Sequence, residues 1–293
     1  MLMAVEHKNV LIRLREMRDS LTPVGRRLAD YILQNPESIP DLSIKDLAQR
    51  SGTSSAAVIR FCRSMGFDGY RSFIIGVSAA VGAMDEGGSP LQFQDIRPGD
   101  DIVTILRSIS ASNHQSIDDT LSVLDQGEVE KAVALLLKAD RIAFCGLGAS
   151  GLVCMDAQQK FMRINKNCMV YSDGHSQLMG AVLLDSRSVA VLVSNSGETV
   201  EVLDTLEVLR SRGVPTIAIT RYGRSTLADL ADIVLYISTP ELLIRSAAMG
   251  SRIAMLNIVD ILYAGVVSQD YAQVEKYLVR TRNVITEKRQ KRG

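Results

Sequence analysis

One stretch of the sequence, residues 188–213, restricts the fold more than any other. Its first part, Val189–Val193, is an unbroken run of β-branched and aliphatic residues without polar alternation. Such a run is typical of a strand buried on both faces, as in a parallel sheet that helices cover. Apolar residues then recur at helical spacing from Val202 to Leu209, and Gly213 ends this predicted helix. The stretch therefore predicts a strand, a turn and a helix of an α/β fold.

The turn between this strand and helix is rich in hydroxyl groups. It reads Ser194, Asn195, Ser196, Gly197, Glu198 and Thr199. The first amides of a helix have no partner within the helix, and its dipole favours negative charge there, so such a turn is suited to bind an anion. The alternative is that Ser196 only caps the helix and nothing binds. The turn alone leaves both interpretations open.

Four further apolar segments alternate with helical ones and predict a five-stranded, mainly parallel sheet between helices, which is a Rossmann-like arrangement. The five predicted strands are Arg141–Gly146, Cys168–Tyr171, Val189–Ser194, Val214–Thr220 and Ile233–Ser238. In such sheets ligands bind beyond the carboxyl ends of the strands. The hydroxyl-rich turn lies at one of these ends.

A second loop lies at another of these ends. Gly146, Gly148 and Gly151 form a G-x-G-x-x-G pattern directly after a strand, and Asp173 follows 22 residues after Gly151, which formally matches a dinucleotide fingerprint. The competing interpretation is that Gly148 lets the backbone approach a phosphate to which Ser150 donates. We favour a phosphate site, because the hydroxyl-rich turn would converge on the same place. In addition, Asp173 opens a polar run that is typical of the start of a helix.

Composition describes an ordinary globular protein. Apolar residues make up 46% of the 293 residues and charged residues 23%. The apolar region from Ala247 to Val267 is interrupted by Arg252, Asn257 and Asp260, which predicts a buried helix rather than a membrane span. The four cysteines are scattered without metal-ligand spacing, so we expect reduced thiols in a cytoplasmic protein and neither a metal site nor a cofactor.

The formal net charge of zero hides an asymmetry. Residues 1–82 contain 11 Lys and Arg against 8 Asp and Glu, while the remaining residues contain 22 against 25. The first part is therefore +3 and the rest −3. This surplus permits nucleic-acid binding without requiring it.

Within the positive part, two short helices joined by a glycine turn predict a helix-turn-helix. Ser43 caps the first helix, residues 51–53 form the turn, and Ser54 caps the second helix, which Gly66 ends. In this motif the second helix enters the major groove of DNA by its N-terminal end. We expect small, hydroxyl-bearing and basic side chains to contact DNA there. They are Ser43 and Lys45 of the first helix and Ser54, Ser55, Ala56, Arg60 and Arg63 of the second.

These patterns divide the chain into two domains and a linker. Residues 1–82 form the predicted helix-turn-helix domain. Residues 83–101 are rich in Gly, Pro and Asp without any periodicity, which is typical of a linker. Residues 102–293 form the α/β domain with flanking helices, among them Ile102–Leu124 and Glu128–Lys138.

Two resemblances support this division. The segment Leu21–Phe73 resembles the DNA-binding domain of RpiR/MurR-type transcriptional regulators, most specifically in its Leu-Thr-Pro start and its Val-Ile-Arg-Phe-Cys-Arg ending. Ala57 and Ser55 depart from that family, which usually has Thr and often Glu there. The loops FCGLGASG and LVSNSGET, within residues 128–269, resemble the sugar isomerase (SIS) domain, a phosphosugar-binding module. The SIS resemblance implies that the effector contacts are Gly148, Ser150, Ser194, Asn195, Ser196, Gly197, Thr199 and Glu241.

Together the resemblances imply a transcriptional regulator of amino-sugar or other carbohydrate metabolism. It would sense a phosphorylated sugar and bind a palindromic operator as a homodimer or homotetramer. Isomerases of the SIS type need a positioned base. Candidate bases are Glu198, Glu201, Glu241 and His175, but their spacing indicates no catalytic pair, so we expect sensing rather than catalysis. The alternatives are a regulator that senses NAD(H) through Gly146, Gly148, Gly151 and Asp173, and a phosphosugar isomerase.

Overall fold

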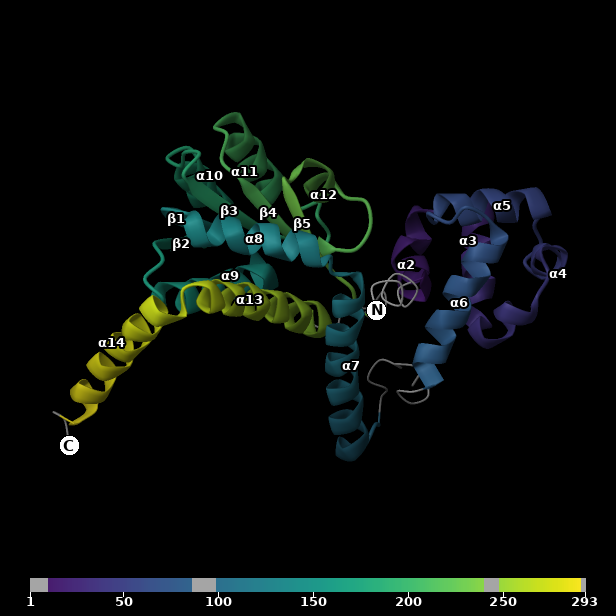
Figure 1. Ribbon diagram of the computed structural model, residues 1–293, viewed down its shortest axis with the longest axis horizontal. Helices are drawn as coiled ribbons and strands as arrows, with labels where there is room; N and C mark the ends of the chain where they lie inside the picture. The colour runs from purple at the N-terminus through teal and green to yellow at the C-terminus, as the bar shows by residue number, and fades with distance from the viewer. Residues whose placement is uncertain (1–9, 86–98, 240–247, 291–293) are drawn as a thin grey trace. The chain divides into compact units, whose positions relative to one another are not determined.

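The computed structural model describes residues 10–85, 99–239 and 248–290, and these residues divide into two compact units. The first unit contains residues 1–123 together with 222–224, and the second contains the rest. Figure 1 shows a helical unit and a unit in which helices enclose a sheet. The helix Ile102–Val123 groups with the first unit, although the sequence places it at the start of the second domain.

In its described part the first unit contains helices joined by turns and no strand. Short polar caps start its helices, as the sequence predicts: Thr22 accepts from the amide of Gly25, Ser43 from Asp46, and Ser54 from Ala57. The α-helices are α2 (Val10–Met17), α3 (Pro23–Gln34), α4 (Ile44–Arg50), α5 (Ser55–Ser64), α6 (Tyr70–Asp85) and α7 (Ile102–Val123). Two 3-10 helices, η1 (Arg18–Ser20) and η2 (Pro36–Asp41), flank α3. Helix α6 covers the first residues of the predicted linker, whose residues 86–98 lie outside the described part.

A closed apolar core holds α4 and α5 in the helix-turn-helix arrangement. Leu47 of α4 and Val58 and Phe61 of α5 are almost completely buried in one cluster with Leu28 of α3. The ring of Phe73 on α6 packs edge-on against Phe61, with centroids 6.0 Å apart. This packing fixes the second helix of the motif against the bundle and leaves its other face exposed.

The second unit is a five-stranded, all-parallel sheet, as the sequence predicts. Its strands are β1 (Arg141–Cys145), β2 (Cys168–Val170), β3 (Ser188–Val193), β4 (Thr216–Arg221) and β5 (Ile233–Ile237), in the spatial order β2-β1-β3-β4-β5. The central strand β3 is buried along its whole length. Alternate residues of β3 contribute to two separate apolar cores, with Val191 on one face and Leu192 on the other.

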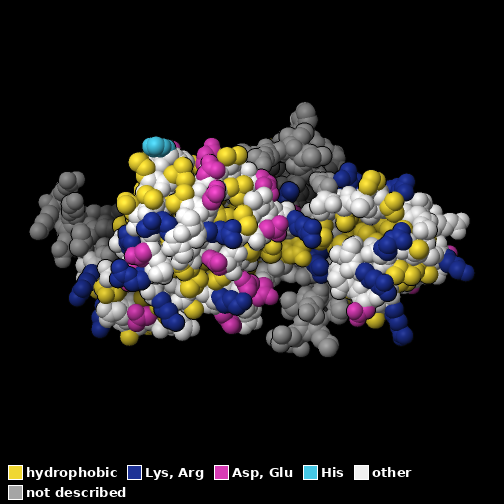
Figure 2. Space-filling model, turned by 90° about the horizontal axis from the view of Figure 1, so that it is seen from above, with side chains coloured by type: hydrophobic (Ala, Val, Ile, Leu, Met, Phe, Trp, Pro, Cys, Tyr) yellow, Lys and Arg dark blue, Asp and Glu magenta, His cyan; other side chains and the backbone are white. Residues whose placement is uncertain are grey.

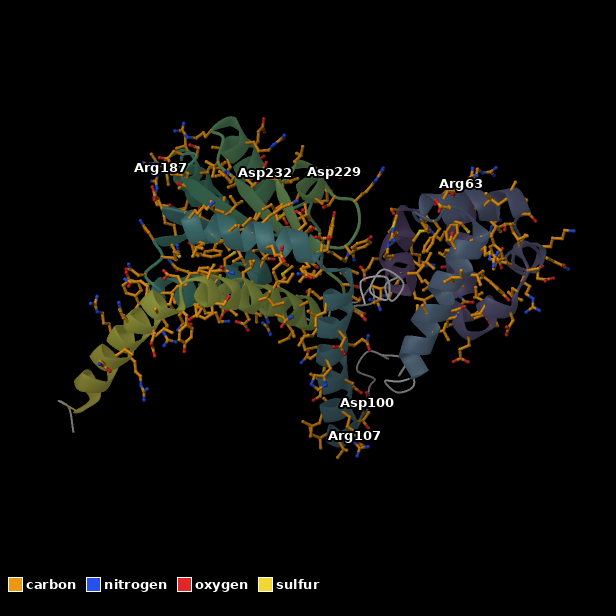
Figure 3. The ribbon with its side chains drawn as sticks, in the orientation of Figure 1. Arg63, Asp100, Arg107, Arg187, Asp229 and Asp232 are labelled. Atoms are coloured by element: carbon orange, nitrogen blue, oxygen red, sulfur yellow. The ribbon has the colours of Figure 1, made fainter. Side chains whose placement is uncertain are left out.

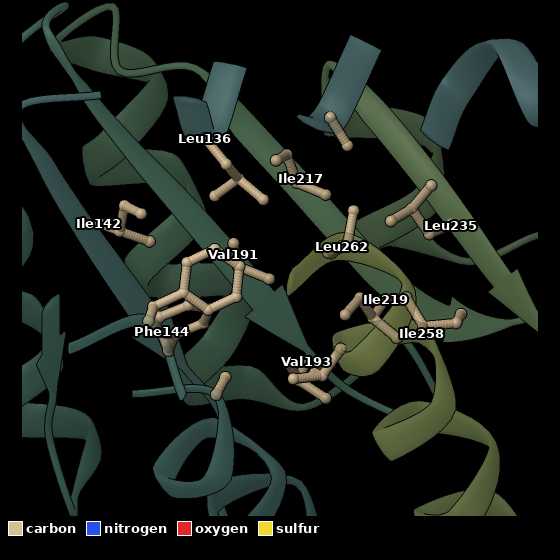
Figure 4. Packing of buried hydrophobic residues seen from close by; sticks show 14 of the residues in the cluster. Leu136, Ile142, Phe144, Val191, Val193, Ile217, Ile219, Leu235, Ile258 and Leu262 are labelled. Atoms are coloured by element: carbon tan, nitrogen blue, oxygen red, sulfur yellow. The ribbon is translucent and has the colours of Figure 1, made fainter. Parts of the chain in front are cut away.

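Helices cover both faces of this sheet. The larger core packs α8 (Gln126–Lys138), α9 (Gly148–Arg163) and α13 (Met249–Gln269) against one face, and Figure 4 shows its tightly packed centre. The other face carries α10 (Gly174–Ala181), α11 (Val200–Ser211) and α12 (Thr226–Leu230). The last helix, α14 (Tyr271–Gln290), follows α13.

Helix α13 is the one helix, within the residues that the structure covers, with the length and apolar composition to cross a membrane. Eight of its residues are buried, among them Ile258 and Leu262, which lie in the larger core with residues of α8 and α9. The helix therefore serves as a core element of the α/β unit, as the sequence predicts.

Candidate functional site

Both predicted loops lie at the carboxyl edge of the sheet and in adjacent positions. Strand β1 pairs with β2 on one side and with β3 on the other, so the strand order reverses between β1 and β3. The loop 146–147 follows β1, and the loop 194–199 follows β3. Ligands of open α/β sheets bind at such a reversal point. The fold therefore brings together the two loops that the sequence singles out.

The loop 194–199 is held in shape by its own hydroxyl groups. Ser194 Oγ lies 2.9 Å from Thr199 Oγ1 and accepts from the amide of Gly197 at 3.1 Å. Ser196 Oγ accepts from the amide of Glu198 at 3.2 Å. The Ser194–Thr199 pair has two hydroxyl protons and uses one between its oxygens, so one remains to donate elsewhere. Ser194 is 2% exposed, whereas Ser196 is exposed, so Ser194 braces the loop and Ser196 lies at its surface.

Gly197 fits this loop onto the neighbouring strand and helix. Its φ of +67° is in the left-handed region that favours glycine. A Cβ atom there would lie 2.2 Å from Ser225 Oγ and 2.9 Å from Thr220 Oγ1. The backbone also ties the loop down, because the amide of Leu227 donates to the carbonyl of Gly197 at 3.1 Å. The loop is therefore a rigid element seated on β4 and α12.

Four helices begin at this edge of the sheet, and their caps divide them into two pairs. Asp173 caps α10 by accepting from the amide of Ser176, and Ser225 caps α12 by accepting from Ala228. By contrast, no side chain caps α9 at Leu147 or α11 at Thr199. Uncapped helix N-termini offer amide donors and a positive dipole end to an anion. Among these four helices, the two without a side-chain cap are those that follow the two predicted phosphate loops. Helix α13, which follows β5, likewise has no side-chain cap at Ala248, but it follows neither of these loops.

The three glycines of the first loop each have a local structural role. A Cβ atom on Gly146 would lie 3.0 Å from both Val193 O and Cys154 Sγ, and one on Gly151 would lie 3.2 Å from Gly146 O. Gly148 has a φ of +56° with open space around its Cα. The first and third glycines thus allow close packing, while the second presents bare backbone at the edge where Ser150 lies half-buried.

Asp173 caps a helix, and this role argues against the dinucleotide interpretation. Its carboxylate accepts from the amide of Ser176 at 2.9 Å, and this hydrogen bond is the main cause that lowers the pKa of Asp173. In a dinucleotide site this acid would instead bind a ribose hydroxyl. The start of a helix at Asp173, which the sequence predicts, is confirmed.

Among the four candidate bases, Glu198 has both oxygens engaged. They accept from Thr226, one from its amide at 2.7 Å and one from its hydroxyl at 2.8 Å. The side chains of His175 and Glu201 are exposed at the first turns of α10 and α11. Glu241 lies outside the described residues.

The side chains predicted to contact DNA lie on the exposed face of the helix-turn-helix. Ser43, Lys45, Ser54, Ala56, Arg60 and Arg63 are exposed, and Ser55 is half-buried. Figure 3 shows Arg63 on the outer side of α5, and Figure 2 shows many Lys and Arg but few Asp and Glu side chains on the visible face of this unit. Ala57, which departs from the resemblance, is 7% exposed and belongs to the buried face. Its small size therefore affects packing rather than the exposed surface.

Sequence reasoning missed the contacts that hold the two loops in place. Gln177 was visible only as part of the polar run after Asp173, yet its Nε2 donates to the carbonyl of Gly146, 31 residues away, at 3.1 Å. The Glu198–Thr226 contact spans 28 residues. Neither pair has a local signal, although Ser225 in the sequence Arg-Ser-Thr-Leu-Ala was recognisable as a helix cap.

The fold and both sites define a helix-turn-helix protein with a SIS domain, and comparisons with known proteins agree. The helix-turn-helix domain of the rpiR family matches residues 8–82, and the SIS domain matches residues 135–264. An uncharacterised helix-turn-helix transcriptional regulator of Caldanaerobacter subterraneus is 39% identical over 95% of this chain and 97% of its own length. The regulator YbbH of Bacillus subtilis is 35% identical over 93% of this chain and 95% of its own.

Among solved structures, the Vibrio vulnificus NanR protein complexed with ManNAc-6P is 27% identical and has a TM-score of 0.60, with 95% of this chain and 98% of that chain covered. An RpiR transcription factor from Sphaerobacter thermophilus (sugar isomerase domain), at 20% identity and a TM-score of 0.56, shows the same fold over 61% of this chain. The chain belongs to the RpiR family of helix-turn-helix transcriptional regulators with a SIS domain.

Proposed function

We propose that this regulator senses a phosphorylated sugar through its SIS domain and controls genes of amino-sugar or other carbohydrate metabolism. The observation that carries the proposal is the pair of uncapped helix N-termini, α9 and α11, beside two hydroxyl-bearing loops at the reversal point of the sheet. Amide and hydroxyl donors together bind a dianionic phosphoryl group well. NanR, a relative over nearly the whole chain, was solved with ManNAc-6P, which supports a phosphosugar as the effector.

Each loop has a distinct role in this proposal. Ser196 and Thr199 donate their hydroxyl protons to the phosphoryl oxygens, while the buried Ser194 holds Thr199 and Gly197 in place. Gly148 allows the phosphoryl group to approach the first turn of α9, where Ser150 adds a further donor. Asn195 and Gly197 shape the second loop, and Glu241 contacts the sugar hydroxyls.

Sensing rather than catalysis is the function that we infer. The carboxylate of Glu198 accepts two hydrogen bonds from Thr226, so it is not poised to remove a carbon-bound proton. The relatives from Caldanaerobacter subterraneus and Bacillus subtilis, which match 95% and 93% of this chain, are named as transcriptional regulators. The site of action would then be the bacterial cytoplasm, where the operator DNA lies.

The effector site is tested by thermal shift with a panel of sugar phosphates, the parent sugars and NADH. We expect a sugar phosphate to stabilise the chain, and the parent sugars and NADH not to do so. At a sugar phosphate concentration of about a hundred times Kd, the free energy of unfolding should rise by about 2.7 kcal/mol. The double substitution S196A/T199V should reduce this affinity about 100- to 10,000-fold, because each of the two lost charge-assisted hydrogen bonds contributes about 1.5–3 kcal/mol and every 1.4 kcal/mol is about tenfold. S211A, which removes an exposed hydroxyl at the far end of α11, is the matched control. Stabilisation by NADH but by no sugar phosphate would refute the proposal.

We also propose that α5 contacts a palindromic operator and that two or four copies bind together. Dimeric helix-turn-helix proteins place their recognition helices about 34 Å apart, to reach successive major grooves. R60A and R63A should each weaken operator binding. Each should also reduce, by about one, the slope with which the logarithm of the binding constant falls with the logarithm of the salt concentration. R210A, which removes an exposed arginine of α11, should leave binding unchanged. If all three variants bound the operator in gel shifts as the wild type does, α5 would not be the helix that contacts DNA.

A further inference from the structure

Gln177, in the first turn of α10, joins two of the connections at the carboxyl edge of the sheet. Its side chain is completely buried. The amide nitrogen Nε2 donates to Gly146 O at 3.1 Å and lies 3.4 Å from Tyr171 O. Gly146 begins residues 146–151, which with residues 194–199 form the two loops of the proposed effector site and are called the first and second effector loops, and Tyr171 directly follows β2. One buried amide therefore joins the connection after β1 to the connection after β2.

The amide oxygen of Gln177 has no partner among the described residues, although it is buried. Both neighbours of Nε2 are carbonyl oxygens, which can only accept, so the orientation of the amide is fixed. A buried acceptor without a partner costs about 1–3 kcal/mol. An apolar side chain of the same size would avoid this cost. Among the described residues, the hydrogen bonds of the Gln177 side chain are therefore made by its donor group.

The bond to Gly146 O sets the direction of the first amide of the loop. In the planar trans peptide that joins Gly146 to Leu147, the carbonyl oxygen and the amide hydrogen point in opposite directions. Fixing the carbonyl toward Gln177 thus fixes the Leu147 amide away from it. Leu147 is the N-cap residue of α9, for which no side chain provides a cap. Its amide would therefore be available, with the other first amides of α9, to a phosphoryl group in the proposed site.

Helix α10 also contacts the start of the second loop's helix. A Cβ atom on Gly174 would lie 2.8 Å from the Cβ and Cγ atoms of Glu201, so the first turns of α10 and α11 touch. The same short helix therefore braces the first loop through Gln177 and supports the helix that follows the second loop through Gly174. This places Gln177 between the two halves of the effector site.

We propose that Gln177 is a positioning residue that orients the first effector loop for the phosphoryl group, without contacting the effector itself. The inference rests on the proposed phosphosugar function. It predicts that removal of the amide donor weakens effector binding more than it weakens the fold. Gln158 on α9 provides a matched control, because its Nε2 also donates to a backbone carbonyl, Cys168 O at 3.2 Å, but not to an effector loop.

The test compares Q177M and Q158M by calorimetric titration with a sugar phosphate that stabilises the wild type. Methionine nearly keeps the side-chain volume and removes the donor. We expect Q177M to bind about tenfold more weakly, the equivalent of about 1.4 kcal/mol, and Q158M to bind like the wild type. Equal affinities for Q177M and the wild type would overturn the positioning role. Failure of the wild type to bind any sugar phosphate would instead refute the proposed function, so the two failures are distinguishable.

A second variant keeps the proposal testable if Q177M does not fold. In Q177E a protonated carboxyl group can still donate to Gly146 O, whereas the carboxylate would repel both carbonyl oxygens. The affinity deficit of Q177E relative to the wild type at the same pH should therefore widen as the pH rises from about 5 to about 9. A deficit that does not change with pH would contradict the donor role.

Discussion

Gly197 and Gly213 separate two reasons for which a position requires glycine. Both have a left-handed φ, +67° and +64° respectively. Around Gly213 there is open space, whereas a Cβ atom on Gly197 would overlap Ser225 Oγ. Backbone strain therefore acts at both positions, but a steric conflict at the effector loop arises only at Gly197.

The substitution G197A should abolish effector binding, while G213A should leave it intact. The left-handed conformation costs about 1–2 kcal/mol for alanine, and displacement of Ser225 adds about 1–3 kcal/mol at Gly197. Chemical denaturation together with a phosphosugar titration measures both effects. If G197A bound the effector as tightly as G213A, the rigid seating of the loop on Ser225 would be wrong.

The cysteine thiols are a second property of single residues. Burial raises the pKa of Cys62 and of Cys145 to about 12 and that of Cys154 well above its usual value. Since the thiolate is the reactive form, these thiols should react very slowly with a disulfide reagent at pH 8 and rapidly after unfolding. Rapid reaction of Cys62, Cys145 or Cys154 with the reagent in the folded chain at pH 8 would contradict this.

The same pKa shifts predict a loss of stability in alkali. Between a pH of about 9 and about 12 the unfolded thiols lose protons that the folded ones retain, so the free energy of unfolding falls across this window. Tyr70 adds to the effect, because burial raises its pKa to about 12 and its hydroxyl donates to Leu42 O at 2.8 Å. Denaturation at pH 8 and at pH 10.5 measures the difference. An unchanged free energy of unfolding would exclude it.

At the scale of elements, two carboxylate–threonine contacts with nearly the same distances lie at opposite edges of the sheet. Glu198 accepts from the amide and hydroxyl of Thr226 at 2.7 and 2.8 Å, beside the effector loop. Asp232 accepts from the amide and hydroxyl of Thr216 at 2.8 and 2.7 Å, where β4 and β5 begin. Figure 3 labels Asp232 in the α/β unit. The two contacts share a chemistry but differ in their distance from the proposed site.

We therefore expect T226V to weaken effector binding severalfold with little loss of stability, because Thr226 is exposed. T216V should lower the free energy of unfolding by about 1–3 kcal/mol, since it leaves a carboxylate without its hydroxyl donor, and should not change the effector affinity. Titration of both variants with the effector and their chemical denaturation test these two expectations. The reverse pattern would show that the Glu198–Thr226 contact does not hold the effector loop.

The elements themselves could be predicted from local signals. All five strands lie where the apolar runs predict them. The inner strands β1, β3 and β4 are buried over almost their whole length, and a strand covered on both faces needs an unbroken apolar run. The caps Thr22, Ser43 and Ser54 could be predicted in the same way, because a helix cap is recognised from residues that are neighbours in the sequence. The contacts of Gln177 and Glu198 could not be predicted, because they join residues 31 and 28 positions apart that only the strand order brings together.

At the scale of the whole molecule, the chain combines a helix-turn-helix unit with a SIS domain, and the proposed function would connect DNA binding by the first to phosphosugar sensing by the second. The net charge of residues 1–82 is +3 and that of the remaining residues is −3, which agrees with DNA binding by the first part of the chain. An effector can change operator affinity only by binding one conformation better than another. The domain boundaries at residues 82 and 102 and the oligomeric state remain predictions of the sequence.

The most direct test of this account is a crystal structure of the chain with the sugar phosphate that stabilises it most. The account predicts one phosphoryl group at the carboxyl edge between β1 and β3, within hydrogen-bond distance of Ser196, Thr199 and the first amides of α9. Gln177 should still bind Gly146 O there. A phosphoryl group bound elsewhere on the chain, or loops 146–151 and 194–199 that contact no ligand, would contradict it.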